Sequence, residues 1–241
     1  MSTFVVASLT PGRLNIHGDA QNANVLAARA QWAGHQAEVV EIHSAADAAG
    51  LTPQAITIGS GFESDADEVR DALTSIADQL HGWVAADIPL LAVGLGWELL
   101  SESTQLSADE SFTGLGVFSG RFVAGQRAVG PVALHSPWGE LIGYEYHYRD
   151  YLLGPDEEAL VRVLAGVGNL TNAQGTRSEG VVRGRSFGTT MRGPILARNP
   201  HLADEMLGDF RALASTNESQ RLADEYAQRT NSRVRDGLGL A

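Results

Sequence analysis

The segment 89–100, PLLAVGLGWELL, has the pattern of a strand that turns sharply into a helix. Many α/β enzymes display a nucleophile at such a turn, because the turn pushes one side chain out above the edge of the sheet. The residue at this turn is Gly94, which has no side chain, and Leu95 and Gly96 follow it. The segment is therefore either a catalytic turn that has lost its nucleophile or a turn that never had one.

The composition removes several kinds of catalyst. All 17 basic residues are arginine, and the sequence contains neither lysine nor cysteine. The lack of lysine excludes a P-loop lysine, Schiff-base chemistry and a lysine general base. The lack of cysteine excludes disulfides, thiolate metal sites and a cysteine nucleophile.

Common active-site signatures are incomplete or missing. A dinucleotide-binding loop would need a third glycine where Leu99 stands, and no G-x-S-x-G motif of a serine hydrolase occurs. The seven histidines lack the H-x-x-x-H spacing of a metal site, so we expect no metal site. Glu145 and His147 lie on one face of a predicted strand and could line a pocket, although a single histidine of this kind is more often structural.

Two glycine-containing turns are the strongest remaining feature. Gly59-Ser60-Gly61 and Gly94-Leu95-Gly96 each follow an apolar run that is typical of a strand. The carboxyl ends of neighbouring parallel strands converge on the ligand crevice of a doubly wound sheet. Glycines at that edge expose backbone N–H groups, which can hold an oxyanion or a carboxylate. The alternative is a pair of tight turns without a ligand.

The elements that must position these turns alternate between two periodicities. Short apolar runs at 4–9, 37–42, 55–61 and 89–94 predict strands, and the patterns at 22–34 and 63–83 predict helices, with Gly34 ending the first. Strand–helix alternation predicts parallel strands joined by crossover helices, in a sheet covered on both faces.

The character of the sequence changes from about residue 113. The segments 114–123, 130–136, 141–148 and 180–190 resemble strands without a long helix between them, which predicts an antiparallel extension packed beside the parallel sheet. Leu202, Met206, Phe210 and Leu213 then form one face of a helix within 199–215. We expect one domain over residues 1–215 and a polar, solvated helical tail over residues 216–241.

Length and charge limit the remaining classes of function. The formal net charge of −12 argues against binding a phosphate backbone, so no nucleic-acid partner is expected. No apolar run approaches the ~20 residues of a membrane span, and the N-terminus lacks the pattern of a signal peptide. We therefore expect a cytoplasmic protein without a membrane span.

The ordered set of motifs resembles the CobB/CobQ-like class I glutamine amidotransferases, and among them the GatD-type glutaminase subunits of lipid II isoglutaminyl synthases. The resemblance implies the flavodoxin-like α/β fold of that class, with a mostly parallel central sheet flanked by helices and an antiparallel extension. The matching segments run nearly the whole length of the chain. They are LNIHGDAQNANVLAARAQWAGHQAEVVEI (14–42), IGSGFESD (58–65), PLLAVGLGWELL (89–100), GLGVF (114–118), GYEYH (143–147), GVGN (166–169), EG (179–180) and GTTMRGPILARNPHLAD (188–204).

In such enzymes a cysteine at the strand-to-helix turn attacks the side-chain amide of glutamine, and a histidine acts as acid and base. The family reads I-C-G-G-Y-Q at the turn and G-T-Y-L-H-G-P at the histidine. The resemblance places these catalytic positions at Gly94 and Arg192, so both catalytic residues are replaced. Glycine offers no nucleophile, and the guanidinium of Arg192 stays protonated at physiological pH and cannot act as a base.

Backbone N–H groups of a glycine loop hold the oxyanion in this family. The resemblance places that loop at Gly59, Ser60 and Gly61, with Leu95 beside it, and the family's glycine triplet has become Gly-Ser-Gly. It also aligns the arginine that contacts glutamine with Arg127, with Arg121 as a nearby competitor.

The resemblance implies a subunit that works with a Mur-ligase-like partner of the MurT type, which amidates the D-glutamate of lipid II, and it implies no cofactor. Because the nucleophile is missing, we expect this chain not to hydrolyse glutamine itself. Two alternatives stay open: a free-standing module that senses glutamine or another amino acid, and an enzyme of altered chemistry that uses Ser60, Glu98 or His147.

Overall fold

Five parallel strands form one half of the sheet in the computed structural model of the chain, which describes residues 3–171, 176–211 and 217–240. They lie in the order β2-β1-β3-β4-β12, as in flavodoxin-like sheets, where ligands bind beyond the carboxyl ends of the strands. The strands are β1 (Phe4–Leu9), β2 (Ala37–Ile42), β3 (Ala55–Ile58), β4 (Leu90–Val93) and β12 (Ser186–Thr189). The predicted α/β fold with a mostly parallel central sheet is confirmed.

Helices cover both faces of this parallel half. The side chains of α1, α6 and α7 pack into one buried apolar cluster, and those of α3, α4 and α5 pack into another on the opposite face. The helices are α1 (Gln21–Trp32), α2 (Ala45–Ala48), α3 (Ala66–Thr74), α4 (Ala77–Ala85), α5 (Leu95–Leu100), α6 (Ile195–Arg198) and α7 (Pro200–Leu207), with short 3-10 turns η1 (Glu63–Asp65) and η2 (Gly208–Phe210). Helix α1 ends before Gly34, which has a φ of +92°, as predicted.

The prediction of one continuous helix over residues 63–83 is wrong. The segment is divided into η1, α3 and α4, and the break falls at Ser75 and Ile76. Ile76 leaves helical geometry, with φ −118° and ψ 12°, and its side chain is buried in the core. The chain therefore turns at Ile76, while Val69, Leu73 and Leu80, whose spacing of four and seven residues is typical of one helix face, are buried.

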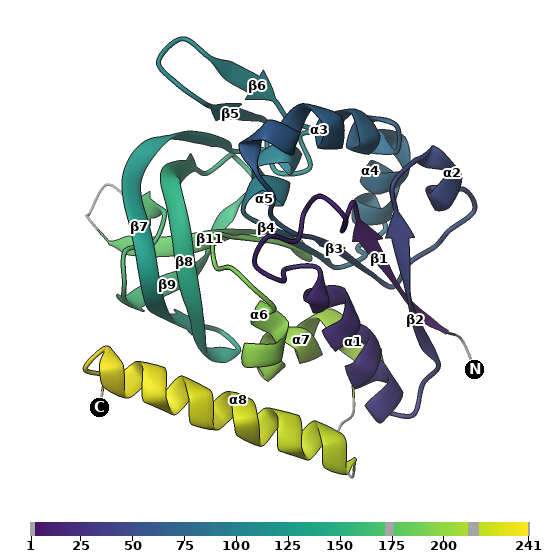
Figure 1. Cartoon of the computed structure of the whole chain (residues 1–241), viewed down its shortest axis with the longest axis vertical. Coiled ribbons are helices and arrows are strands. Elements are labelled where there is room, and N and C mark those ends of the chain that lie inside the picture. Colours follow the sequence, from purple (N-terminus) through teal and green to yellow (C-terminus); the bar gives the residue numbers. More distant parts are fainter. Residues whose placement is uncertain (1–2, 172–175, 212–216, 241) are drawn as a thin grey trace.

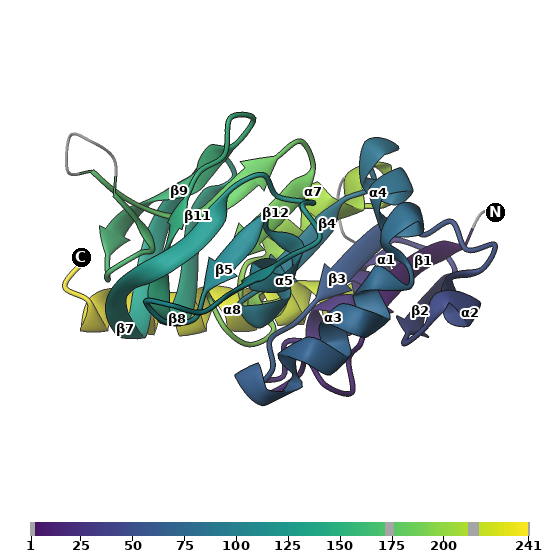
Figure 2. The ribbon, with the colours of Figure 1, turned by 90° about the horizontal axis from the view of Figure 1, so that it is seen from above.

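The antiparallel extension is present, but it continues the parallel sheet and does not pack beside it. Strand β12 pairs in parallel with β4 on one side and antiparallel with β11 on the other. The order then runs β11-β9-β7-β5-β6, with β8 paired to β7 and β10 to β11. These strands are β5 (Ser103–Gln105), β6 (Ser111–Thr113), β7 (Arg121–Ser136), β8 (Gly139–Leu152), β9 (Glu158–Ala165), β10 (Leu170–Thr171) and β11 (Arg177–Arg183). Figure 2 shows the two halves side by side.

The predicted strand over 114–123 begins only at Arg121, because the backbone N–H groups of Leu115 and Phe118 bond to carbonyls of Leu99 and Leu100 at the end of α5. Residues 130–136 and 141–148 form parts of β7 and β8, a long hairpin with a register shift between Ala124 and Ala128.

The end of the chain forms a helix on the outside of the molecule. Helix α8 (Glu218–Gly237) runs past α6, α1 and β8 (Figure 1). Its contact with the body buries Gln220 and Ala227, so the predicted helix is present but is not solvated on all sides. Within the predicted helix 199–215, Leu202 and Met206 are buried as expected, and Leu213 lies outside the described residues. No helix of the described residues is long and apolar enough to cross a membrane.

Candidate functional site

The turn between β4 and α5 has the backbone of a catalytic turn. Gly94 adopts φ +53° and ψ −119°, a combination that favours glycine. Its N–H donates to the carbonyl of Thr189 at 3.0 Å, and its own carbonyl accepts the N–H of Glu98 at 2.9 Å. The first bond ties the turn to β12 and the second begins α5. The sequence therefore places the turn correctly at the carboxyl edge of the parallel strands.

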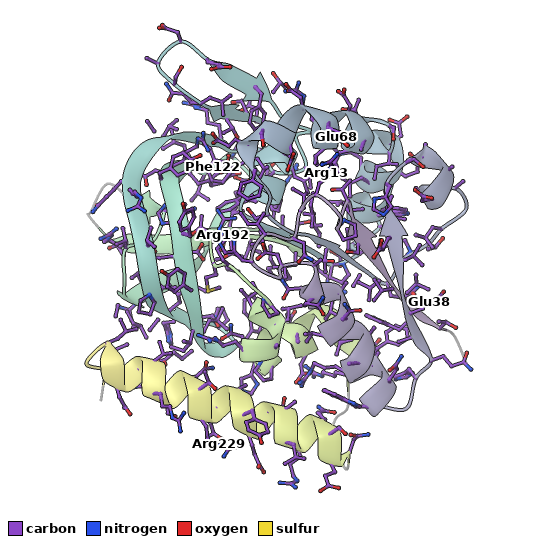
Figure 3. All side chains as sticks on the ribbon, in the orientation of Figure 1. Arg13, Glu38, Glu68, Phe122, Arg192 and Arg229 are labelled. Atoms are coloured by element: carbon purple, nitrogen blue, oxygen red, sulfur yellow. The ribbon has the colours of Figure 1, made fainter. Side chains whose placement is uncertain are left out.

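Arg192 occupies the space above Gly94. A Cβ atom built on Gly94 would lie 1.3 Å from Nη1 and 2.3 Å from Cζ of Arg192, and 2.6 Å from Oγ of Ser60. Carbon atoms approach such neighbours no closer than about 3 Å, so no side chain fits at position 94 while Arg192 stays in place. The two positions that the resemblance assigns to catalysis are thus brought together, and one fills the volume of the other. Figure 3 labels Arg192 near the middle of the molecule, beside β8.

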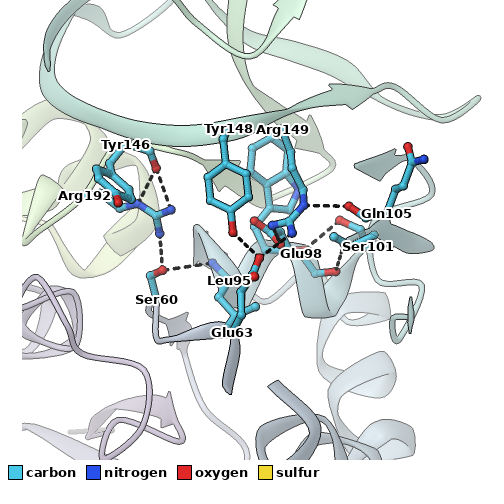
Figure 4. A network of polar contacts seen from close by, with 12 residues as sticks. Ser60, Glu63, Leu95, Glu98, Ser101, Gln105, Tyr146, Tyr148, Arg149 and Arg192 are labelled. Atoms are coloured by element: carbon cyan, nitrogen blue, oxygen red, sulfur yellow. Dashed lines mark hydrogen bonds and ion pairs between the residues drawn. The ribbon is translucent and has the colours of Figure 1, made fainter. Parts of the chain in front are cut away.

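The guanidinium of Arg192 is fixed by three hydrogen bonds. Nε and Nη2 donate to the backbone carbonyl of Tyr146 on β8 at 3.0 and 2.8 Å, and Nη1 donates to Oγ of Ser60 (Figure 4). Its Cζ also lies 5.9 Å from the centroid of the Tyr146 ring. Burial lowers the pKa of Arg192, and the negative charges of Asp19 and Glu98 oppose that shift. The side chain remains a cation at neutral pH.

The side chain of Ser60 already occupies a hydrogen-bond donor at the predicted oxyanion loop. Its Oγ accepts the backbone N–H of Leu95 at 3.2 Å in addition to the hydrogen bond from Arg192. The N–H of Leu95 is the donor that the sequence assigned to an oxyanion, and here a hydroxyl of the chain already uses it. The backbone of the loop packs closely against the backbone of Leu14. A Cβ on Gly59 would lie 2.1 Å from the carbonyl oxygen of Leu14, so only glycine fits at this position.

Asp19 joins the oxyanion loop to the segment that carries Arg192. Its Oδ1 accepts the N–H of Gly193 at 2.6 Å and its Oδ2 accepts the N–H of Ser60 at 3.3 Å. The side chain is almost fully buried, and burial raises its pKa. Sequence reasoning did not single out Asp19, and the only signal was its place inside the long matching block 14–42.

A cavity of about 390 Å³ opens beside Arg192. Arg149 on β8 lies at its inner side and forms ion pairs with Glu63 and, at 3.0 Å, with Glu98 on α5 (Figure 4). Burial raises the pKa of Glu98 to about 7 against the opposing charge of Arg149. The full lining is Ile16, His17, Ser60, Gly61, Phe62, Glu63, Leu95, Glu98, Tyr146, Tyr148, Arg149 and Arg192.

The other candidates of the sequence lie elsewhere. Arg121 and Arg127 are exposed on β7 and neither lines this cavity, so their contact with glutamine stays a prediction, whereas Arg149 was missed. Glu145 accepts the N–H groups of Val167 and Gly168 at 2.6 and 2.7 Å, and His147 lies 3.5 Å from it, both buried within the sheet. The pair does not line the 390 Å³ cavity, which favours the structural interpretation.

The arrangement supports binding more readily than covalent chemistry. Within residues 3–171, 176–211 and 217–240, no group of three histidine, aspartate or glutamate side chains could hold a metal ion. The atoms nearest Gly94 belong to Arg192 and Ser60, and the hydroxyl of Ser60 is bonded by two N–H donors, from Arg192 and Leu95, neither of which can act as a base for it. Gly94 itself offers no side-chain atom that could attack an amide.

Comparisons with known proteins agree with the fold and the motifs. Residues 5–200 match the family described as the CobB/CobQ-like glutamine amidotransferase domain. The chain is 26% identical to the lipid II isoglutaminyl synthase (glutamine-hydrolyzing) subunit GatD of Streptococcus pneumoniae, over 92% of this chain and 90% of the relative. It is 24% identical to the subunit of the same name from Staphylococcus aureus, over 86% and 84%. A solved structure described as a glutamine amidotransferase superposes with a TM-score of 0.59 at 18% identity, covering 84% of this chain and 96% of that one.

Proposed function

Because the chain belongs to the family of CobB/CobQ-like glutamine amidotransferase domains, we propose that it is a GatD-like subunit of a cytoplasmic lipid II isoglutaminyl synthase type complex and does not itself hydrolyse glutamine. One observation supports the second half of this proposal. The guanidinium of Arg192 fills the volume that a nucleophile at Gly94 would need. Loss of a nucleophile and its base together typically costs many orders of magnitude in rate.

The partner we propose is a Mur-ligase-like subunit of the MurT type. The support is that the two GatD relatives are named as subunits of a synthase and match most of this chain. The ligase would then take ammonia from solution or from another source, and this chain would act as a scaffold or an allosteric partner.

The proposal is tested in two assays on the purified protein. Ammonia release from L-glutamine is expected to equal the rate in buffer, both for the chain alone and with the ligase. The ligase is expected to co-purify with the chain and to amidate its substrate when ammonium chloride is added, and to fail with glutamine. Glutamine-dependent amidation, or a chain that stays alone in the presence of the ligase, would contradict the proposal.

A second candidate function is binding of a free amino acid. The observation that favours it is the charged cavity beside Arg192, which Arg149, Glu63 and Glu98 line and which the guanidinium of Arg192 leaves open. Calorimetric titration with L-glutamine and L-glutamate tests it, and no heat of binding at millimolar ligand would remove this candidate.

A further inference from the structure

The space above Gly94 has the chemistry of a cation site. Three acceptors or π surfaces face the guanidinium of Arg192: the carbonyl of Tyr146, the hydroxyl of Ser60 and the ring of Tyr146. A carbonyl that accepts two parallel N–H groups, together with an aromatic ring near the cation, is a typical environment for a planar guanidinium.

The charges around this space have the matching sign. Asp19 and Glu98 both act on Arg192 in the direction that stabilises its charged form. Asp19 is buried and held by the N–H groups of Ser60 and Gly193, so its position is fixed by the backbone on both sides. A neutral amide placed in the same space would gain less from these carboxylates than a cation does.

The chain also fixes Arg192 from its backbone. The N–H of Arg192 donates to the carbonyl of Tyr144 on β8 at 2.9 Å, and the next residue, Gly193, is bound by Asp19. The side chain therefore leaves a segment that is anchored on both sides and returns to the carbonyl of Tyr146 on the same strand, β8. This anchoring lowers the conformational entropy that the guanidinium must lose when it fills the site.

We infer that the space above Gly94 is a guanidinium-binding site that Arg192 occupies in cis, so that the chain supplies its own ligand. This goes beyond the proposed function, because it assigns a ligand class to the site and does not depend on a partner. Its consequence is that this space selects a planar cation over a neutral planar amide.

The test is to remove the internal ligand and offer small molecules in its place. The Arg192→Ala variant is expected to bind methylguanidinium at millimolar concentration, seen as a rise of several degrees in its melting temperature. Acetamide, which is planar and neutral, and ethylammonium, which is charged and not planar, are expected to leave the melting temperature unchanged. The unchanged protein and Arg229→Ala, an exposed arginine on α8, are the controls and should not respond.

Each outcome decides the inference. A response of Arg192→Ala to acetamide as large as that to methylguanidinium would mean that the space does not distinguish a cation from a neutral amide, and no response to either would mean that no site exists.

If Arg192→Ala does not fold, the unchanged protein gives the answer by NMR. The Nε–H of Arg192 is expected to exchange with water at least tenfold more slowly than that of Arg229, and equal rates would overturn the inference. Neither result alters co-purification with a ligase, which tests the proposed function separately.

Discussion

At the residue scale, a side chain at position 94 and the guanidinium of Arg192 exclude each other. The distance of 1.3 Å between a Cβ on Gly94 and Nη1 of Arg192 leaves no room for both. Either substitution alone would have a cost that the other relieves. This mutual dependence is a structural reason why the two family positions differ together, and it can be measured.

Gly94→Ala is expected to destabilise the protein by about 3 kcal/mol, because it adds strain at a positive φ and displaces Arg192. In an Arg192→Ala background only the backbone strain remains, so the same change should cost about 1 kcal/mol. Urea unfolding of the two single variants and the double variant gives a coupling free energy, expected near 2 kcal/mol. Additive effects of the two changes would show that Arg192 does not occupy the space above Gly94.

Glu98 makes stability depend on pH. Burial raises its pKa from the ordinary 4.5 to about 7, so the folded state binds the proton more tightly than the unfolded chain. This contribution to stability is fully present below pH 4.5 and is lost as the pH rises through 7. The loss amounts to roughly 3 kcal/mol, because each pH unit between the two pKa values corresponds to about 1.4 kcal/mol.

Unfolding free energies from urea titrations at pH 4.5, 6 and 8 measure this dependence. Glu98→Gln is expected to flatten the curve between pH 4.5 and 7, while any slope from Asp19, whose pKa is also raised by burial, stays. The matched control is Glu102→Gln, an exposed carboxylate just beyond the same helix, which should leave the slope unchanged. An unaltered slope in Glu98→Gln would mean that Glu98 is ionised at its usual pH.

The sequence identifies the residues of the motifs in this site, but it does not identify the distant residues that contact them. Gly94, Ser60 and Arg192 could be found because motifs align them with catalytic positions. Arg149 and Glu63 could not, because they are 86 residues apart and form one ion pair only after β8 reaches η1. Asp19 escaped for the same reason: its partners Ser60 and Gly193 are distant in sequence.

At the element scale, local patterns predict β1, β2, β3 and β4 of the parallel half well, because each is a short run rich in apolar and β-branched residues with turn residues near its ends. They miss the break at Ile76, since the apolar spacing of Val69, Leu73, Ile76 and Leu80 continues across it. They also miss that β12 joins both halves of the sheet, because strand pairing is set by contacts between distant segments.

Helix α8 is attached to the body through ion pairs, and none of its residues belongs to either apolar cluster of the described residues. Arg29 on α1 is 4% exposed and pairs with Asp204 on α7 at 2.8 Å and with Asp224 on α8 at 2.6 Å. Glu140 on β8 receives Arg235 of the helix at 3.2 Å. Asp204 remains as a partner for Arg29 when α8 moves away, so separation of the helix does not leave an unpaired buried charge.

Asp224→Asn is therefore expected to cost at most about 1 kcal/mol of global stability, because Asp224 is 37% exposed and Arg29 keeps Asp204. Arg29→Ala should cost about 3 kcal/mol, because it leaves two carboxylates without their cation. Hydrogen–deuterium exchange of residues 218–237 is expected to speed up in both variants, before any change in the sheet.

The control is Arg221→Ala, whose ion pair with Glu225 lies within α8. Simultaneous exchange of the helix and the sheet in Asp224→Asn would contradict the idea of a separately attached helix.

At the scale of the whole molecule, the family scaffold is retained around a filled site. The strand order β2-β1-β3-β4-β12, the turn at Gly94 and the loop at residues 59–61 all remain in place. By the resemblance, the positions at which a catalytic group or an oxyanion-loop glycine is replaced are Gly94, Ser60 and Arg192. A scaffold of this kind should accept the family residues again at those positions.

The variant Gly94→Cys/Ser60→Gly/Arg192→His tests whether the scaffold is still competent. Removal of the guanidinium leaves room for the thiol, the glycine frees the N–H of Leu95, and the histidine can stabilise a thiolate. Its thiol is expected to react with iodoacetamide at neutral pH about tenfold faster than the thiol of Gly94→Cys/Ser60→Gly/Arg192→Ala, which lacks the base.

Gly94→Cys alone should be the slowest to react and the least stable of the three variants, because Arg192 must be displaced to make room for the thiol. Equal alkylation rates in all three variants would mean that the backbone no longer brings positions 94 and 192 into catalytic geometry, and that the site has changed well beyond three side chains.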